Sequence, residues 1–182
     1  MEIQMLYIHH YQSPLGGITM SSNGEALTAL RFDCQKQNSC FLEKDQEKIV
    51  NTTDHAIKET EKWLDTYFRG IAPNFMPPIL LDGTEFQETV WNILLCIPYG
   101  EIITYGQIAD KIAKERGLER MSAQAVGGAV SHNPIALIIP CHRVMGKNNN
   151  LTGYAGGIDK KIKLLMMEGI DMTEMYVQKK GR

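Results

Sequence analysis

The sequence contains no long hydrophobic run, and none of its apolar stretches approaches the roughly 18 residues that a transmembrane helix needs. Its beginning also lacks the basic flank and the apolar segment of a secretory signal peptide. We therefore expect a cytoplasmic protein that makes no contact with a membrane. In such a reducing compartment the four cysteines are expected to be free thiols: Cys34, Cys40, Cys96 and Cys141.

A large excess of either charge is also absent. The 19 Lys and Arg residues nearly balance the 21 Asp and Glu residues, for a net charge of -2, so no strongly basic surface is indicated. The charges are nevertheless unevenly distributed, because residues 1–82 carry an acidic excess and residues 83–182 a small basic one. A contact with a polyanion is therefore expected in the second half of the chain.

The motifs of the common cofactor sites are missing, since the sequence has no G-x-G-x-x-G, no G-x-x-x-x-G-K-[ST] and no H-E-x-x-H. Cys34 and Cys40 lie too far apart for the usual zinc-binding pair. We therefore expect neither a cofactor nor a metal. Cys96 falls within an apolar helical segment and is expected to be a core residue.

What is present is typical of a globular protein. The chain has 182 residues, of which 43% are hydrophobic, enough for one domain or two small ones. Residues 3–11 predict a strand, and the pair Asn23-Gly24 predicts a hairpin with a type I′ turn. The polar segment 35–50 predicts an exposed connection, and Asp54 can cap a helix after it. These features predict a small sheet with one helix packed on it.

A domain boundary is expected near residue 82. The preceding segment, 71–83, contains three prolines, which lack a backbone donor, and it therefore predicts a linker. The predicted domains are residues 1–82 and 83–182.

The second domain begins with a series of short helices. Three of them start at side chains that can cap a helix: Thr84 with Gln87, Thr104 with Gln107, and Ser122. An apolar strand is expected at 135–140, and three helices followed by a strand predict a helix-turn-helix-like or winged module. A last helix, 158–168, ends at Gly169, and the polar tail after it is expected to be mobile.

The segment Pro140-Cys141-His142-Arg143 follows the predicted strand and is a candidate for chemistry. A thiol reacts as its thiolate, and a nearby imidazolium or guanidinium favours that form. If the strand stays extended, the side chains of Cys141 and His142 point to opposite faces, so a bridging water or a turn is needed to connect them. The alternative is a packed thiol without a chemical role.

Two further features break local rules. Glu168 occupies the last turn of its helix, where the macrodipole disfavours a carboxylate, so we expect a partner such as a histidine to hold it there. The helix after Ser122 contains two glycines, each of which costs about 1 kcal/mol relative to alanine. Something is therefore expected to approach its backbone closely. A solvated helix end and tight helix packing are the respective alternatives.

Five motifs in order give the chain a family resemblance: TYGQIA, AVGGAV, NPIALIIPCHRV, GYAGG and a helix ending in MEG, all between Phe86 and Gly169. The chain resembles the O6-alkylguanine-DNA alkyltransferases, also called methylated-DNA–protein-cysteine methyltransferases. The resemblance implies an α/β (α+β) fold with a small N-terminal sheet-and-helix domain like ribonuclease H. It also implies a C-terminal winged helix-turn-helix-like domain that binds DNA and transfers the alkyl group.

The resemblance implies catalytic roles for five residues. Cys141 accepts the alkyl group, and His142 deprotonates it through a water molecule. Glu168 orients His142 and balances its charge. Tyr105 donates a proton to the purine that leaves, and Asn133 is a hinge that ties the recognition helix to the active-site strand.

The resemblance also implies which residues contact the DNA. The pocket for the extruded base is lined by Val144, Tyr154 and Ala155. The small-residue helix enters the minor groove with Ser122, Ala123, Ala125 and Gly127. Gln124 departs from the family, because many members carry an arginine there that fills the gap left by the flipped base. The expected partner is double-stranded DNA with alkylated guanine, alkylated thymine being a further candidate, and the expected state is a monomer that reacts once.

Other functions remain open from the sequence. Alkyltransferase-like proteins bind alkylated DNA without repairing it, but they have another residue in place of the cysteine. A regulator that uses alkylated Cys141 as a signal is a second alternative. A cysteine hydrolase is disfavoured by the absence of a separate histidine and Asn or Asp constellation, and reaction with peroxide would indicate a redox sensor.

Overall fold

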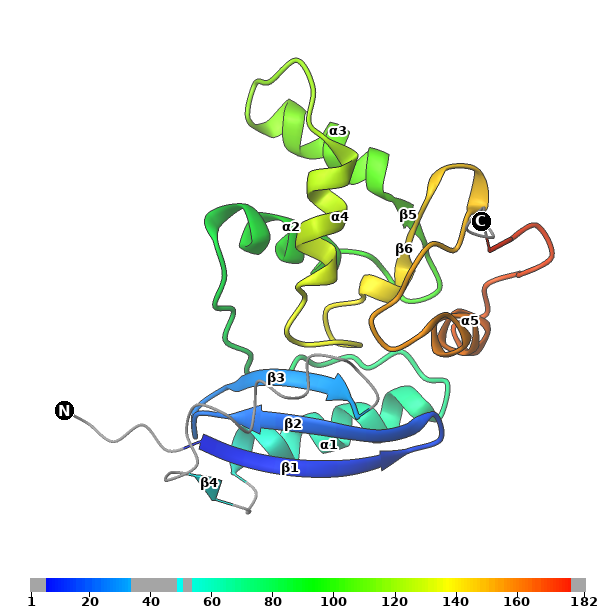
Figure 1. Ribbon diagram of the computed structural model, residues 1–182. Helices are drawn as coiled ribbons and strands as arrows, with labels where there is room; N and C mark the ends of the chain where they lie inside the picture. Colours follow the sequence, from blue (N-terminus) through cyan, green and yellow to red (C-terminus); the bar gives the residue numbers. More distant parts are fainter. Residues whose placement is uncertain (1–5, 34–48, 51–53, 178–182) are drawn as a thin grey trace. The chain divides into compact units, whose positions relative to one another are not determined.

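The computed structural model describes residues 6–33, 49–50 and 54–177 (Figure 1). The chain forms two compact units. One consists of residues 1–82 together with 134–138, and the other of residues 83–133 together with 139–182. Residues 134–138 were expected in the second domain, but they pack with the first unit.

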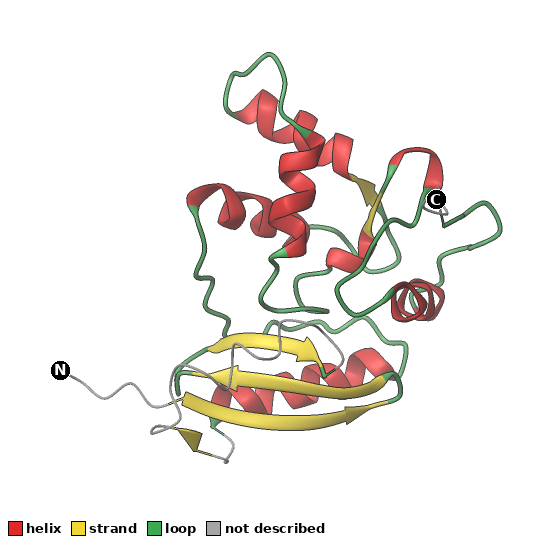
Figure 2. Ribbon diagram, viewed as in Figure 1, coloured by secondary structure: helices red, strands yellow, loops and turns green. Residues whose placement is uncertain are grey.

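The first unit is a four-stranded sheet with one helix packed on it (Figure 2). The strands follow the order β3-β2-β1-β4, with β4 parallel to β1 and the other pairs antiparallel. Their bounds are β1 Leu6–Ser13, β2 Gly16–Ser22, β3 Leu27–Phe32 and β4 Ile49–Val50, and the helix is α1 His55–Phe68. The predicted cap is present, because Asp54 Oδ1 accepts a hydrogen bond from the Ile57 backbone N–H at 2.8 Å.

The predicted hairpin is confirmed, but its predicted turn type is wrong. Strands β2 and β3 are joined by residues 23–26, and of the pair Asn23-Gly24 only the glycine has a positive φ, at 97°. A type I′ turn needs positive φ at both central residues. Here Asn23 Oδ1 instead accepts hydrogen bonds from the backbone N–H groups of Glu25 and Ala26, at 3.0 and 2.9 Å. These side-chain bonds stabilise the loop together with a backbone bond from the Asn23 N–H to Ala26 O at 3.2 Å.

Two predictions for the first unit reach beyond the described residues. The exposed connection expected at 35–50 contains the short strand β4, and its remaining residues are not described. Cys34 and Cys40 also lie outside the described part of the chain, so the structure says nothing of them.

The strand predicted at 135–140 is wrong. Ile135 forms only an isolated bridge to Leu30 of β3, through backbone bonds of 3.0 and 2.9 Å. Leu137 then turns the chain with a positive φ of 70°. The chain enters a single 3₁₀ turn, η2, at Cys141–Arg143. Apolar residues were therefore a sign of burial here, not of extended backbone.

The second unit contains the helices α2 Glu85–Leu95, α3 Tyr105–Glu115, α4 Ala123–Ser131 and α5 Ile158–Met167. It also has a two-stranded parallel sheet, β5 Ile103–Thr104 with β6 Val144–Met145, and a second 3₁₀ turn, η3 Lys147–Asn149. Both predicted capping boxes are present, and Ser122 Oγ accepts from the Ala125 N–H at 3.3 Å. Helix α4 packs against α2 and α3. No helix in the described part of the chain is long and apolar enough to cross a membrane.

Two expectations about the second unit are corrected. Cys96 is exposed and not a core residue; it is the C-terminal cap of α2 and lies beyond the buried residues of that helix. The segment after Gly169 is not a loose tail as far as Val177. Its residues Met172 and Met175 pack against a buried cluster around Leu165, and Tyr176 O accepts from the Leu151 N–H at 2.9 Å.

Candidate active site

The turn η2 carries three buried functional side chains in succession. Cys141 is 9% exposed, His142 is fully buried and Arg143 is 7% exposed. The Val144 N–H donates to Cys141 O and closes the turn. The sequence predicted opposite faces for Cys141 and His142 if the chain stayed extended. Because Cys141 and His142 lie in a 3₁₀ turn and not in an extended strand, their side chains are not held on opposite faces.

Glu168 has the histidine partner that its position at the end of a helix predicted. It is the C-terminal cap of α5, and its Oε1 lies 2.7 Å from His142 Nε2. Arg143 donates to the same carboxylate through Nε at 2.8 Å and Nη2 at 3.1 Å, and the Gly100 N–H adds a bond of 3.3 Å. Several donors therefore hold a carboxylate that the helix dipole disfavours.

The charge states of this cluster follow from its contacts. Burial raises the pKa of the Glu168 carboxyl, but hydrogen bonds from His142 and Arg143 outweigh it and lower the pKa to about 2. Burial lowers the pKa of His142 against the opposing bond to Glu168, so the imidazole is neutral at neutral pH. An ionised Glu168 accepts the proton on Nε2, which makes Nδ1 the basic nitrogen of His142.

Arg143 has a different role from the expected one. We expected a guanidinium beside Cys141 to favour the thiolate, but Arg143 binds Glu168 and also donates to Ile97 O through Nη1 at 2.6 Å. Its guanidinium carbon lies 5.7 Å from the centre of the Tyr99 ring. The sequence contained one signal for this pairing: a buried carboxylate at a helix end needs a cation, and the PCHR segment contains one.

Lys161 was missed entirely. Its side chain is fully buried on α5, and Nζ donates to Val144 O at 2.6 Å. The available signal was its position on the helix, because it lies on the same face as Ile158 and Leu165, three and four residues away. Burial lowers the pKa of Lys161 to about 8, while the nearby Cys141 acts in the opposite direction.

The Cys141 thiol is tuned by its surroundings. Burial raises the pKa of the thiol above its usual range, and the Asn133 side chain, the charge of Lys161 and nearby backbone N–H groups only partly oppose this rise. Asn133 Nδ2 donates to Ile139 O at 2.8 Å. Asn133 and Ile139 flank residues 134–138, which pack with the first unit. This bond therefore connects the two ends of that segment. The Asn133 side chain thus links the end of α4 to the segment that leads into η2.

Tyr105 begins α3 beside the other site residues. Burial raises the pKa of its phenol, so the hydroxyl is protonated at neutral pH. The hydroxyl lies 3.4 Å from Thr152 Oγ1. The Tyr105 ring packs by Gly127 of α4, where an added Cβ would lie 3.8 Å from it. The loop from 152 onward and α4 therefore both position this phenol.

The predicted pocket residues occupy different environments. The Tyr154 ring lies edge-on to His142, with centroids 6.4 Å apart, and its buried hydroxyl has no hydrogen-bond partner among the described residues. Burial raises the Tyr154 pKa well above its usual range. Val144 is buried directly after η2, and Ala155 is exposed.

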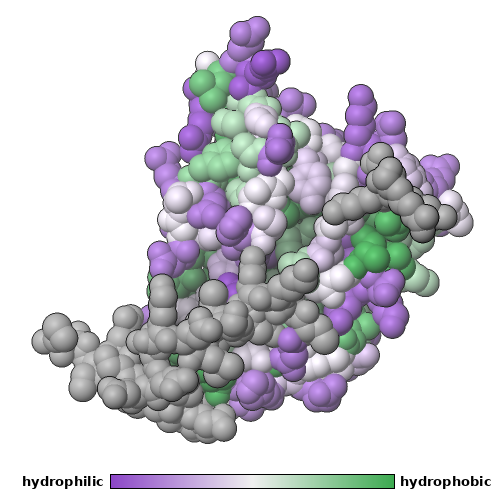
Figure 3. Space-filling model, in the orientation of Figure 1, coloured by the Kyte–Doolittle hydropathy of each residue, from purple (hydrophilic) through white to green (hydrophobic). Residues whose placement is uncertain are grey.

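The predicted DNA-contacting helix presents its first turn to solvent. The exposed residues are Ser122, Ala123, Gln124 and Ala125, while Gly127 is half-buried. In Figure 3 the surface over α4 is pale, as small residues make it, and hydrophilic side chains border it. Among the basic residues nearby, Lys111, Lys114 and Arg120 are exposed. Arg116 donates instead to Glu85 Oε1 at 3.1 Å.

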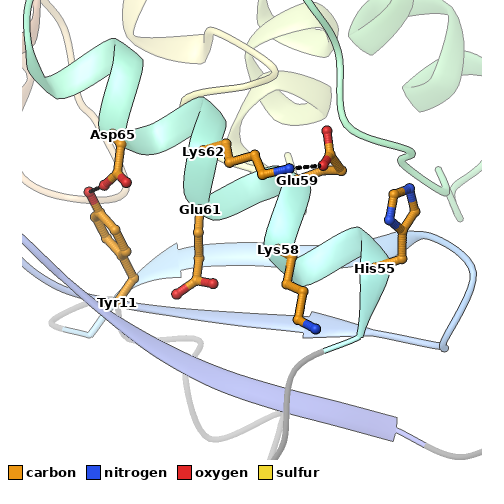
Figure 4. A pocket seen from close by; sticks show the side chains of 7 residues that line it. All are labelled: Tyr11, His55, Lys58, Glu59, Glu61, Lys62 and Asp65. Carbon is orange, nitrogen blue, oxygen red and sulfur yellow. Dashed lines mark hydrogen bonds and ion pairs between the residues drawn. The ribbon is translucent and has the colours of Figure 1, made fainter.

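A surface hollow of about 530 Å³ lies on the first unit and includes none of these residues (Figure 4). Tyr11, from β1, donates to Asp65 on α1 at 2.7 Å, and Lys62 pairs with Glu59 at 2.6 Å. Its charged groups thus largely satisfy one another. Among the described residues no group of His, Cys, Asp and Glu side chains is arranged to hold a metal ion.

Both halves of the chain match known protein domain families. Residues 6–81 match the model of the 6-O-methylguanine DNA methyltransferase ribonuclease-like domain, and residues 85–170 match that of the DNA binding domain. A methylated-DNA–protein-cysteine methyltransferase of Methanosarcina acetivorans is 40% identical over 164 residues, covering 90% of this chain and 99% of the relative. The Mycobacterium bovis protein of the same name is 41% identical over 167 residues, covering 90% and 93%.

Solved structures agree with these relatives. The O6-methylguanine methyltransferase of Mycobacterium tuberculosis has a TM-score of 0.75 at 39% identity, over 90% of this chain and 93% of that one. The Mycobacterium tuberculosis protein OGT in complex with DNA gives a TM-score of 0.74 at 39% identity, over 89% and 92%. The expected fold class is confirmed. Similarity of this degree over nearly the whole chain shows that it belongs to the methylated-DNA–protein-cysteine methyltransferase family.

Proposed function

We propose that the protein repairs DNA by moving the alkyl group of O6-alkylguanine onto Cys141, once per molecule. The observation that carries this is the buried turn in which Cys141 precedes a neutral His142 held by Glu168 at 2.7 Å. The names of its relatives support the same reaction. Residues 83–182 would bind the DNA and carry out the transfer, with residues 1–82 forming the ribonuclease-like part.

The lesion must leave the double helix to reach this thiol. Cys141 is buried in its turn, and an alkyl group on a stacked, paired guanine cannot approach it. The exposed first turn of α4 has small side chains that allow close approach to the minor groove. Val144 and the Tyr154–Ala155 loop would then line the pocket for the extruded base. A crystal structure of the Mycobacterium tuberculosis relative contains DNA, which supports DNA as the partner.

Activation of the thiol uses the relay that the geometry favours. Glu168 keeps the proton of His142 on Nε2, so Nδ1 is the nitrogen that accepts a proton. A water molecule between the two side chains would pass the thiol proton of Cys141 to His142. The imidazolium formed is then stabilised by the Glu168 carboxylate, whose pKa is lowered to about 2.

In the transfer step the sulfur of Cys141 attacks the alkyl carbon. A carbon–sulfur bond forms as the carbon–O6 bond breaks, and the electron pair of that bond moves into the purine. Tyr105, protonated at neutral pH, donates its proton to the purine so that neutral guanine leaves. The imidazolium of His142 holds the proton taken from the thiol. A thioether is a poor leaving group, so Cys141 is not regenerated.

The proposal is tested by mixing the protein with a duplex that contains one O6-methylguanine and measuring intact mass. The expected result is a stoichiometric gain of one methylene on Cys141. Specific binding to the lesion without a mass gain would instead support the non-repairing DNA-binding alternative. A duplex with O4-methylthymine tests the second substrate in the same way. The monomeric state and the cytoplasmic location stay predictions.

Replacing Tyr105 with phenylalanine is expected to slow methyl transfer about 100-fold, the lower end of the usual contribution of a general acid. The ring and its packing by Gly127 remain, so DNA affinity should be unchanged. Single-turnover rates from quenched samples measure the effect, with Tyr176→Phe as an exposed control. An unchanged rate for Tyr105→Phe would remove the phenol from the mechanism.

Replacing Gln124 with arginine is expected to make DNA binding more sensitive to salt. Gln124 is exposed on the first turn of α4 and carries no charge, whereas a cation that neutralises one phosphate adds about 0.9 to the slope of log affinity against log salt. Fluorescence anisotropy over a salt series measures this slope. The same slope in both proteins would contradict the assignment of position 124 to the DNA interface.

A further inference from the structure

Thr152 has a backbone conformation that a threonine rarely adopts. Its φ is 48°, in the left-handed region, where a β-branched side chain is unfavourable and glycine is the usual residue. The other non-glycine residues with a positive φ in the described part of the chain are Leu137, Asn148 and Asn149, and none of them is β-branched. Strain of this kind is characteristic of functional sites. The side chain of Thr152 therefore calls for an explanation.

The loop around Thr152 fixes the direction of its side chain. A Cβ added to Gly146 would lie 2.6 Å from Thr152 Cγ2, so the methyl group fills the space that a side chain at position 146 would need. The Thr152 N–H donates to Asn150 Oδ1 at 3.2 Å, and Asn150 O accepts from the Gly146 N–H at 2.7 Å. A β-branched side chain is stiff at χ1. The packing of the methyl group therefore also sets the position of the hydroxyl.

The Thr152 hydroxyl lies beside the phenol of Tyr105, with 3.4 Å between the two oxygens. This distance exceeds the usual range for O–H···O bonds, about 2.5–3.0 Å. Catalytic hydrogen bonds are often long before the substrate binds and shorten in the complex. A phenolate attracts a donor more strongly than a phenol does, because hydrogen bonds to ions are shorter and stronger. The contact is thus placed to tighten when the phenol loses its proton.

Loss of the Tyr105 proton creates a charge where the surroundings oppose it. Burial disfavours the phenolate and raises the pKa of Tyr105, and a thiolate on Cys141 acts in the same direction. The hydrogen bond from Thr152 acts in the opposite direction and lowers this pKa. A donor that is in place before the reaction needs no reorganisation when the charge forms. The Thr152 hydroxyl therefore favours the proton transfer that its neighbour has to make.

We propose that Thr152 is a positioning residue for Tyr105, its hydroxyl donating to the phenol oxygen while the phenol proton moves to the purine. In this step the O–H bond of Tyr105 breaks, its electron pair stays on the phenol oxygen, and an N–H bond forms on the purine. Thr152 keeps its own proton and stabilises the phenolate. The inference rests on the proposed function and on the part of Tyr105 in it.

Single-turnover methyl transfer at saturating DNA tests this role. Thr152→Val removes the hydroxyl, keeps the branched shape and should slow transfer about tenfold, near the lower end for a hydrogen bond to a charged group. Thr152→Ser keeps a hydroxyl and should recover most of the rate. In a Tyr105→Phe protein, Thr152→Val should have no further effect, because the hydroxyl acts through the phenol. Thr173→Val, on the exposed segment after α5, should transfer at the parent's rate.

The proposal is overturned if Thr152→Val transfers as fast as the parent. It is equally overturned if Thr152→Ser is as slow as Thr152→Val, or if Thr152→Val slows Tyr105→Phe by the same factor as the parent, since both results would indicate a purely structural role. Should Thr152→Val fail to fold, Thr152→Gly takes its place. Glycine adopts the positive φ without strain and lacks the hydroxyl, so this variant should also be slow. Transfer by Thr152→Gly at the parent's rate would contradict the proposal.

A measurement without DNA separates Thr152 from the proposed function. The tyrosines are replaced by fluorotyrosine, whose phenol ionises at a lower pH, and the ¹⁹F resonance of Tyr105 is identified with Tyr105→Phe and titrated. In a Cys141→Ser background, which removes the thiolate, Thr152→Val should raise the midpoint by about one pH unit, the equivalent of a tenfold effect. This rise in a protein whose parent takes no methyl from O6-methylguanine would contradict the repair function alone. Normal repair with an unchanged midpoint would contradict the role of Thr152 alone.

Discussion

The Cys141→Ser variant is expected to accept no methyl group from O6-methylguanine, while the parent gains one per molecule. A serine hydroxyl has nearly the size of the thiol but does not ionise in the accessible pH range, so the turn η2 remains and the nucleophile is lost. Intact mass after incubation with the lesion duplex measures the gain. The expected loss is complete, which makes this the largest effect predicted for activity.

Cys96→Ser provides the matched control. Cys96 and Cys141 are the two free thiols in the described part of the chain, one exposed at the end of α2 and the other buried in η2. The exposed thiol is more accessible but lies outside the site, so Cys96→Ser should still gain one methyl. Transfer that persists in Cys141→Ser and disappears in Cys96→Ser would show that accessibility, and not the site, selects the acceptor.

Replacing Glu168 with glutamine is expected to cost about 3–5 kcal/mol of the free energy of unfolding, as for loss of one partner in a buried ion pair. Arg143 would lose the carboxylate to which its Nε and Nη2 donate hydrogen bonds, and its buried guanidinium would be left without an anionic partner. His142 would lose the acceptor that fixes its tautomer. Denaturant unfolding measures the first effect and single-turnover transfer the second.

Glu101→Gln serves as the control for this substitution, because Glu101 is exposed on the loop before β5. It should change stability by less than about 0.5 kcal/mol. If Glu168→Gln were no less stable than Glu101→Gln, the buried cluster would not contribute to folding as the contacts indicate. A Glu168→Gln protein that is as stable as the parent but transfers the methyl group slowly would support the role of Glu168 in the relay and contradict its role in stability.

The same carboxylate makes stability depend on pH in a defined direction. The pKa of Glu168 is about 2 in the folded protein against an ordinary 4.5, so the folded state favours the ionised form. Its contribution, about 3 kcal/mol, is complete above about pH 4.5 and is lost as pH falls toward about pH 2. Thermal unfolding of the parent and Glu168→Gln over this range should show a steeper acid loss in the parent.

The sequence by itself determined the features that depend on neighbours in the chain. The caps at Asp54, Thr84 and Thr104 were predictable because each involves a side chain and a backbone group three residues on. The need of Glu168 for a partner was predictable too, since a carboxylate at a helix C-terminus faces the negative end of the dipole. The motif order around Cys141 determined the family.

Only the tertiary structure decided how these parts meet. The strand expected at 135–140 became a bridge and a turn because Ile135 pairs with β3, distant in sequence. Arg143 binds Glu168 and the Ile97 carbonyl, and Lys161 lies buried by Val144 instead of facing water. Charge and hydropathy predict exposure for such residues. Their burial depends on partners from other elements, which only the folded packing of those elements brings into contact.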